Sequence, residues 1–483
     1  MDIISCYIRQ FNYKTPLYLY IIILMKDTDK MLDRTMNIIK KYYIHSEKYP
    51  FLKYKTPAEH KKDIDLKISK KWMGVDKIFD EMEKIVLASP KTSSTWFFNL
   101  LFGGQVFPAV AAEMLTAVLN NTMHTYKSAG IHILIENEVI DFMNKKIWFK
   151  NGDGLFTPWG SLSNTVAMII ARNEKEKSVM NTGIQKKKLT AYTSDQWHYS
   201  IPKAINFVGI GKDNLRVIKS DEKGKMDSKE LESQIKKDIK DWYIPFFIKA
   251  TAGTTVLGAF DNIIEIAKIA KKYKIRLHID ASLWGTALLS KKYKYLLKGI
   301  DQADSVTWNP HKMMNVPVLA APILVKDPTV LLKSFHEEAD YLIQPQKKED
   351  MLDLAKLNPA SKSIQCGRRN DAFKVWTALK FLWEDGYEKR VNHQFDLAKY
   401  ATQTIKKDKD LILVLEPECI NVCFQVQGKS ASKICEALDR KWLIKVSYGQ
   451  RKGKEFIRLM TVNADMTKKD IDNFFKQVMT VKI

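Results

Sequence analysis

The stretch DSVTWNPHKMM, residues 304–314, is the most informative segment of this 483-residue chain. Its apolar run at 305–308 predicts a buried strand, and the Asn-Pro dipeptide that follows ends the strand and turns the chain. His311 and Lys312 come next, so we expect both at the carboxyl end of the strand, where open α/β sheets bind ligands. A lysine held there can form a Schiff base if burial and neighbouring cations activate its amine. Position alone also permits an ordinary solvated lysine.

A second strand, ending on a carboxylate, is predicted upstream. Ile275, Leu277 and Ile279 alternate with polar residues up to Asp280. Lys312 follows 32 positions later (312 − 280), which leaves room for a turn, a helix and one more strand. Two neighbouring strand ends could therefore present an acid and an amine to one cleft. Pyridoxal phosphate (PLP) requires this pair, because the lysine carries its aldehyde as an imine and the carboxylate keeps its ring nitrogen protonated.

Six segments of the chain resemble the group II PLP-dependent amino-acid decarboxylases, nearest to the glutamate, cysteine sulfinate and aspartate decarboxylases. They occur in the family's order and near its spacing. The resemblance implies the PLP-dependent transferase fold of type I. The segments are GDGLFTPWGSLSN (152–164), SDQWHYS (194–200), ATAGTTVLGAFD (250–261), HIDAS (278–282), NPHK (309–312) and IQCGRR (364–369).

The apolar pattern agrees with an α/β fold of this type. Strands alternate with helices across 110–330, which predicts a mostly parallel sheet covered by helices on both sides. Beyond 390 the pattern predicts a small α+β domain, whose last helix is capped by Thr467 and Asp470. We expect an N-terminal extension (1–49), an N-terminal helical segment (50–109), a large PLP-binding domain (110–385) and a small C-terminal domain (386–483).

Several individual elements are also predicted. INFVGIG (205–211) and FFIKA (246–250) have strand-like apolar runs. Asp261 is the expected cap of a helix over 263–273, and the polar, irregular stretch 345–362 is expected to form a loop.

The resemblance implies roles for the residues around the cofactor. It implies that Lys312 binds the cofactor aldehyde as an imine and that Asp280 contacts the ring nitrogen. His198 would stack on the ring and take part in protonation, and Thr255 would contact the cofactor head.

The phosphate is expected where Gly160 opens a helix, since free backbone N–H groups at a helix start bind anions. An ordinary helix cap has the same pattern. The resemblance places Leu162 and Ser163 at the phosphate, with Asn309 beside it. Relatives usually have Gly-Gly where this chain has Trp159-Gly160, so Trp159 could crowd the turn.

Two further histidines are expected to support the site rather than act as acids: His278 and His311, the latter beside the cofactor. The pair His278/Asp280 could suggest a metal, but there is no third ligand at a sensible spacing, so no metal is expected.

Tyr341 matches the tyrosine on the family's mobile loop that protonates Cα after carbon dioxide leaves. Its presence favours simple decarboxylation over oxidative aldehyde formation, although a packing tyrosine is the alternative. The surrounding loop departs from relatives, with LNPASK in place of a YDTGDK-like run.

Arg458, on an apolar strand face, needs a partner for its guanidinium, either an internal acid or a bound carboxylate. The resemblance places the carboxylate-binding arginine here. Leu100, Thr122 and His124 replace pocket residues of the glutamate decarboxylases, which favours cysteine sulfinate or aspartate as substrate.

Charge and composition exclude other classes of function. The net charge of +23 comes from lysines spread over many predicted helices, with no recognition motif, so nucleic-acid binding is not expected. The positive field favours anionic substrates. The apolar run 17–25 is too short to cross a membrane, which takes about 20 residues. Five cysteines, an odd number without zinc spacing, suit a reduced cytoplasmic protein.

We therefore expect a PLP-dependent α-decarboxylase that converts a small acidic amino acid to its amine and carbon dioxide. A homodimer with shared active sites is expected, with neither nucleic acid nor membrane as partner. Two alternatives remain: a PLP-binding homologue with altered or lost activity, and a basic, non-enzymatic binding protein on the same fold.

Overall fold

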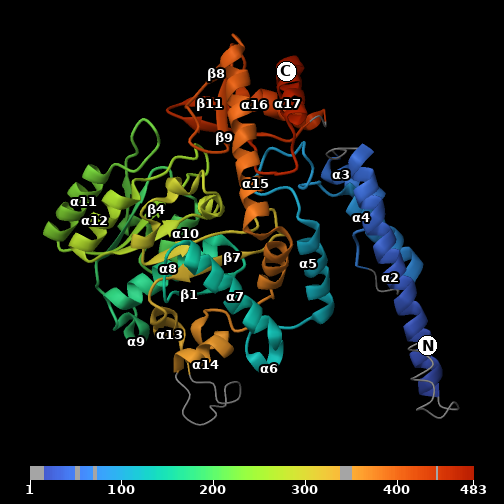
Figure 1. Ribbon diagram of the computed structural model, residues 1–483, viewed down its shortest axis with the longest axis horizontal. Helices are drawn as coiled ribbons and strands as arrows, with labels where there is room; N and C mark the ends of the chain where they lie inside the picture. Colours follow the sequence, from blue (N-terminus) through green and yellow to red (C-terminus); the bar gives the residue numbers. More distant parts are fainter. Residues whose placement is uncertain (1–15, 49–54, 69–72, 338–350, 442–443) are drawn as a thin grey trace.

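The computed structural model describes residues 16–48, 55–68, 73–337, 351–441 and 444–483. The chain forms a body around one large sheet, with a smaller sheet at one end and a pair of helices projecting to one side (Figure 1).

Among the described residues the large sheet has seven strands, and six of them run in the same direction. Only β7 is antiparallel to both of its neighbours. This confirms the predicted mostly parallel sheet. In spatial order the strands are β1 (Asp153–Thr157), β7 (Ala321–Val325), β6 (Ser305–Thr307), β5 (Arg276–Asp280), β4 (Ile244–Thr251), β2 (Leu189–Ser194) and β3 (Leu215–Ile218).

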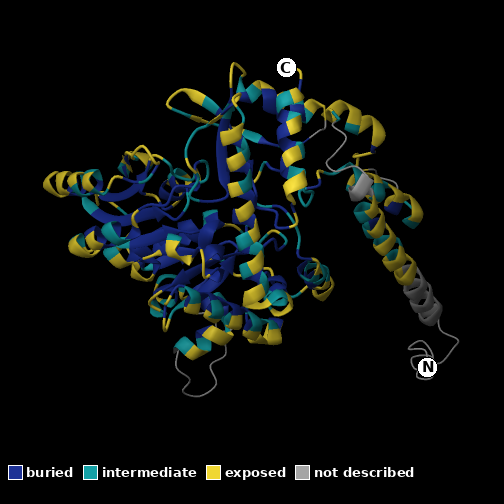
Figure 2. Cartoon of the chain, turned by 45° about the horizontal axis from the view of Figure 1, so that its top comes forward, coloured by how far each residue is buried: buried dark blue, intermediate teal, exposed yellow. Residues whose placement is uncertain are grey.

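Both faces of this sheet are covered by helices, so its strands are buried from both sides (Figure 2). Along β7, Ile323 and Val325 join the core on one face, whereas Leu324 joins the core on the other. The first face carries α8 (Gly160–Lys175), α10 (Ser200–Phe207) and α13 (Thr329–Phe335). The second carries α7 (Ile131–Lys146), α11 (Ser228–Lys240), α12 (Ile263–Tyr273) and α15 (Ala372–Lys407).

A small antiparallel sheet forms the C-terminal part, reached through the long helix α15, which is bent at Trp383. The expected boundary after residue 385 falls just beyond this bend. Thr467 and Asp470 form the predicted capping box of the last helix. The elements are β10 (Ser447–Arg451), β11 (Lys454–Met460), β9 (Asn421–Val426), β8 (Leu411–Leu413), α16 (Ala431–Arg440) and α17 (Lys468–Thr480).

The N-terminal helices α2 (Pro16–Lys48) and α4 (Val75–Ala88) lie side by side, away from the body (Figure 1). Lys30 pairs with Asp76 at 2.9 Å across this hairpin. Within the described part of the chain, no helix is both long and apolar enough to span a membrane. Shorter helices are α3 (Pro57–Asp63), α5 (Phe107–Leu119), α6 (Tyr126–Ala129), α9 (Val179–Thr182) and α14 (Met351–Leu357).

Three predicted elements were wrong. Residues 205–211 are not a strand: Ile201, Ala204 and Ile205 are buried at helical spacing on α10, and two glycines of positive φ follow it. Asn262, not Asp261, caps α12; Asp261 instead accepts hydrogen bonds from backbone N–H groups elsewhere. Within 345–362, the described part contains α14 and a 3₁₀ turn rather than only a loop.

Candidate active site

A cavity of about 450 Å³ lies at the carboxyl edge of the large sheet. The ends of β4, β5 and β6 meet there, as the strand-end rule predicts. The small sheet closes the cavity with one residue of β11. Seven of the predicted site residues line it: Leu100, His198, Thr255, Asp280, Asn309, Lys312 and Arg458.

Asp280, at the end of β5, accepts a hydrogen bond on each of its carboxylate oxygens. Its Oδ2 accepts from Asn164 Nδ2 at 3.1 Å, and its Oδ1 accepts from the backbone N–H of Ser282 at 3.1 Å. Burial favours the neutral acid, but the nearby positive charges of Lys249 and Lys312 hold the pKa of Asp280 well below its usual range. The side chain is therefore a carboxylate inside the protein.

Lys312 follows β6 in a tight turn, where its backbone N–H donates to Asn309 O at 3.0 Å. Burial lowers the pKa of Lys312 to about 8; Asp280 opposes this shift and Lys249 adds to it. About a tenth of the amine is thus uncharged at pH 7, far more than for an ordinary lysine. Such an amine is a nucleophile suited to an aldehyde.

Three histidines surround these two residues and are neutral. Burial lowers the pKa of His198 to about 4, and that of His278 and of His311 to about 3. His278 Nε2 lies 2.9 Å from Asn164 Oδ1 and its Nδ1 lies 2.9 Å from Ser305 Oγ, so both ring nitrogens have a partner within the protein. His198 lines the cavity beside Tyr199, with ring centroids 4.5 Å apart.

The start of α8 forms one end of the cavity. Gly160 and Ser161 line it, and a Cβ on Gly160 would lie 2.7 Å from Asn309 Nδ2. Ser163 points elsewhere: its hydroxyl is buried against Thr157 Oγ1 at 2.8 Å and donates to a backbone carbonyl. Thus Ser161, rather than the predicted Ser163, lines this end of the cavity.

Other predicted residues lie outside the cavity. Leu162 packs against the core, and His311 lies behind Trp159, with ring centroids 4.7 Å apart. Thr122 contacts the backbone of Arg368, and the backbone N–H of His124, two residues later, donates to Thr122 O at 2.8 Å. Tyr341 falls outside the described residues, so its role stays a prediction.

Several residues at the site were not singled out from the sequence. Asn164 bridges Asp280 and His278, and Thr251 lines the wall next to Asp280. Lys249, fully buried, lies behind that wall. The only signal in the sequence was a lysine within the otherwise apolar strand run FFIKAT.

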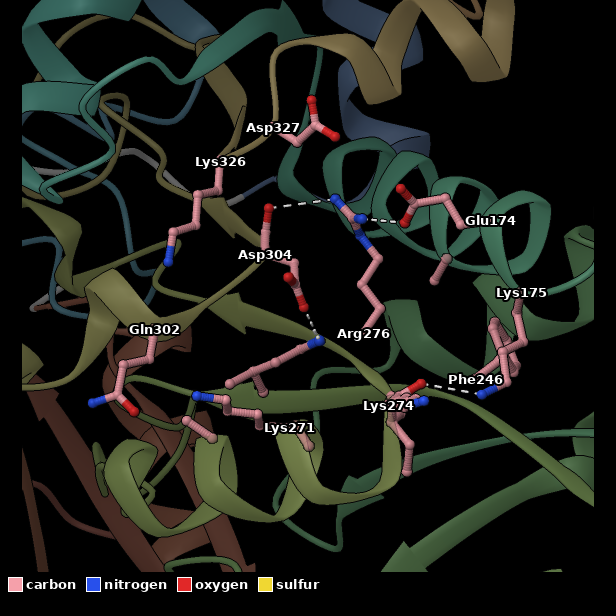
Figure 3. Close-up of a pocket in the computed structure, with 15 residues that line it drawn as sticks. Glu174, Lys175, Phe246, Lys271, Lys274, Arg276, Gln302, Asp304, Lys326 and Asp327 are labelled. Atoms are coloured by element: carbon pink, nitrogen blue, oxygen red, sulfur yellow. Dashed lines mark hydrogen bonds and ion pairs between the residues drawn. The ribbon is translucent and has the colours of Figure 1, made fainter.

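A larger cavity, about 690 Å³, lies at the opposite edge of the sheet, where β5 begins (Figure 3). Its charged groups mostly bond within the protein: Arg276 pairs with Glu174, and Asp304 accepts from the backbone N–H of Leu277 at 2.7 Å. Because parallel sheets bind ligands at the other edge, we assign catalysis to the smaller cavity.

The conserved domain of pyridoxal-dependent decarboxylases matches residues 57–427, and the chain belongs to this family. The acidic amino acid decarboxylase GADL1 of Xenopus tropicalis is 37% identical, over 87% of this chain and 85% of the relative. Cysteine sulfinic acid decarboxylase of Homo sapiens is 35% identical, over 87% and 88%. The crystal structure of mouse CSAD in apo form matches with a TM-score of 0.89 and 32% identity, over 94% and 98%. The protein is a PLP-dependent amino-acid decarboxylase.

The residues of the cavity fit this cofactor. Asn309 Oδ1 is buried without a hydrogen-bond partner in the described chain, and the turn at Gly160 has no room for a side chain. The start of α8 suits a phosphate, Asp280 suits the ring nitrogen, and Lys312 suits the aldehyde. When bound, PLP takes up the electrons of the bond that decarboxylation breaks.

Proposed function

We propose that this enzyme removes the α-carboxylate of a small acidic amino acid, with cysteine sulfinate or aspartate preferred to glutamate. The observation that carries the proposal is the state of Arg458. This half-buried guanidinium has no acidic partner among the described residues.

The contacts of Arg458 hold it in place without neutralising it. Its Nη1 donates to Thr255 O at 2.9 Å, and its Nη2 donates to Asn99 O at 2.8 Å and to Ser447 Oγ at 3.2 Å. Its Nε is buried without a partner in the described chain. Burial removes water from the guanidinium and lowers the pKa of Arg458. The distal acid of a substrate would supply the missing counter-charge.

The preference for a short substrate rests on Leu100. It lines the cavity with an apolar side chain, so it offers no hydrogen bond to a longer distal carboxylate. In this proposal Arg458 binds the distal acid and Asp280 stays ionised beneath the ring. Tyr341 returns a proton to Cα after carbon dioxide leaves, and the neutral His198 stacks on the ring and takes part in this transfer.

We extend the proposal to a homodimer with shared active sites. Large apolar side chains are exposed on the projecting α2–α4 hairpin and on α5, which supports burial against a second copy. Thr122 and His124 would then line the partner's cavity rather than their own. The exposed apolar residues are Leu32, Met36 and Ile44 on α2, Ile78, Met82 and Ile85 on α4, and Phe107, Leu115, Val118 and Leu119 on α5.

Mixing two inactive variants tests the shared site. Lys312→Ala and His124→Ala should each lose activity, whereas a mixed dimer should regain part of it, because one of its two sites is intact. Mixtures that stay inactive although mixed dimers form would contradict the sharing of residues.

We place the enzyme in the cytoplasm, since the four cysteines of the described chain are free thiols.

Replacing Arg458 tests the function itself. Arg458→Met should lower kcat/KM for acidic substrates by roughly 10²–10³, the cost of removing one partner from a buried charge pair. PLP binding should change little. The matched control is Arg390→Met, because Arg390 pairs with Asp465 away from the cavity. If acidic substrates are handled equally well without Arg458, the proposal fails.

A further inference from the structure

Lys249 is a fully buried lysine in the middle of the large sheet. It lies on β4, where every residue from 245 to 251 is buried, and its side chain is 0% exposed. Lysine is almost never fully buried unless it is paired. An unpaired ammonium at this depth would carry a large desolvation cost, so the fold must provide a partner.

That partner is Asp280. Lys249 Nζ lies 3.6 Å from Asp280 Oδ2 and donates to Thr251 Oγ1 at 2.7 Å. Strand register explains the contact, because Lys249 is opposite His278 and Thr251 is opposite Asp280. The lysine and the carboxylate therefore share one face of the sheet, two residues apart in register. Lys249 does not line the cavity itself, but it contacts Asp280, which does.

The charge of Lys249 reaches the other groups of the site. Burial and Lys249 both lower the pKa of Lys312. Burial raises the pKa of Asp280, whereas Lys249 lowers it. Burial raises the pKa of Asp261 to about 6, and Lys249 opposes that rise too. The titratable groups around the pair are Asp261 before α12, His278 on β5, His198 before α10 and Lys312 after β6.

We propose that Lys249 is a second cation of the active site, a positioning residue that keeps Asp280 ionised in the cofactor-free protein and favours the uncharged amine of Lys312. When the cofactor binds, Asp280 would face its ring nitrogen as one half of an ion pair. The inference concerns the site of the proposed function, but its test does not depend on the substrate.

The test measures how readily Lys312 reacts at different pH values. The full-length chain, freed of cofactor, is labelled with trace acetic anhydride between pH 6 and 10, and each lysine is followed by mass spectrometry. In the wild type, labelling of Lys312 should have its midpoint near pH 8. In Lys249→Met the midpoint should rise by about half a pH unit or more, since a nearby positive charge has been removed. The exposed Lys236 serves as an internal standard.

Two variants separate charge from packing. Lys249→Arg keeps the charge and should keep the midpoint. Lys362→Met removes another buried lysine, one that pairs with Asp153 at 2.6 Å, and should leave Lys312 unchanged. An unshifted midpoint in Lys249→Met, or an equal shift in Lys362→Met, would overturn the proposal.

A third variant covers the case in which Lys249→Met does not fold. The double variant Lys249→Met/Asp280→Asn removes both charges, so it should fold where the single variant fails, because no unpaired carboxylate remains in the sheet. If the double variant is as unstable as the single one, Lys249 has only a packing role and the proposal is wrong.

Discussion

Asp280 and Lys312 stand at the ends of neighbouring parallel strands, and each shifts the pKa of the other. Asp280 pairs in register with Thr307, five residues before Lys312. Burial lowers the pKa of Lys312 to about 8 against the pull of Asp280, and Lys312 in turn helps to keep Asp280 ionised. The acid and the amine that PLP requires are thus brought together by strand order alone.

Lys312 should be the lysine that carries the cofactor. Its amine lines the cavity and has the lowered pKa of a nucleophile. After borohydride reduction of the holoenzyme, peptide mapping should find the phosphopyridoxyl group on Lys312. The group on any other lysine, including Lys249, would contradict the assignment.

Removing the carboxylate of Asp280 should almost abolish catalysis. The loss of a charge pair in a dry site costs several kcal/mol in the transition state, so turnover in Asp280→Ala should fall by at least ~10³. The comparison is with Asp304→Asn, at the opposite edge of the sheet. Steady-state kinetics at saturating PLP give the result, and a near-normal rate would remove Asp280 from the mechanism.

Gly160 should be required for cofactor affinity more than for folding. An added methyl group would lie 2.7 Å from Asn309 Nδ2 and 2.9 Å from Ser282 Oγ, at the proposed phosphate end. Gly160→Ala should therefore weaken PLP binding by roughly tenfold or more, a cost of about 1.4 kcal/mol. Equilibrium titration of PLP measures it. Gly367→Ala, where the nearest atom is 3.4 Å away, should bind PLP normally.

Acid should destabilise the protein partly through its buried histidines. The folded-state pKa of His278 is about 3, below the ordinary 6.5. Between pH 6.5 and 3 the unfolded chain therefore binds a proton at this histidine and the folded chain does not. The free energy of unfolding falls as the pH falls through this range, by up to about 1.4 kcal/mol per pH unit for each such histidine. In His278→Gln the fall in Tm between pH 7 and pH 5 should be smaller than in the wild type. An identical fall in both proteins would show that His278 does not contribute.

Features that follow from local chain chemistry could be predicted from the sequence. The alternation before Asp280 and the Asn-Pro stop before His311 fixed two strand ends, and the structure confirms both strands. The run 205–211 was ambiguous, because short apolar segments suit a buried helix as well as a strand. The start of this run is helical because α10 packs on α8, a contact that the sequence alone does not reveal.

Contacts between distant segments could not be predicted in this way. Lys249 resembles any other lysine until the register of β4 on β5 places it 3.6 Å from Asp280. Likewise, the hydroxyl of Ser163 is turned away from the cavity by its bond to Thr157, which depends on how α8 packs on β1. Long-range geometry, rather than residue type, determines both.

The most direct test of the account is the release of carbon dioxide from a panel of amino acids by the wild-type enzyme. Arg458 requires a distal anion, and rejection of neutral substrates should exceed the ~1–3 kcal/mol that a missing methylene provides. We expect kcat/KM to be highest for cysteine sulfinate or aspartate, lower for glutamate and barely measurable for aromatic amino acids. A preference for glutamate would contradict the argument from Leu100, and a preference for an aromatic substrate would contradict the role of Arg458 as well.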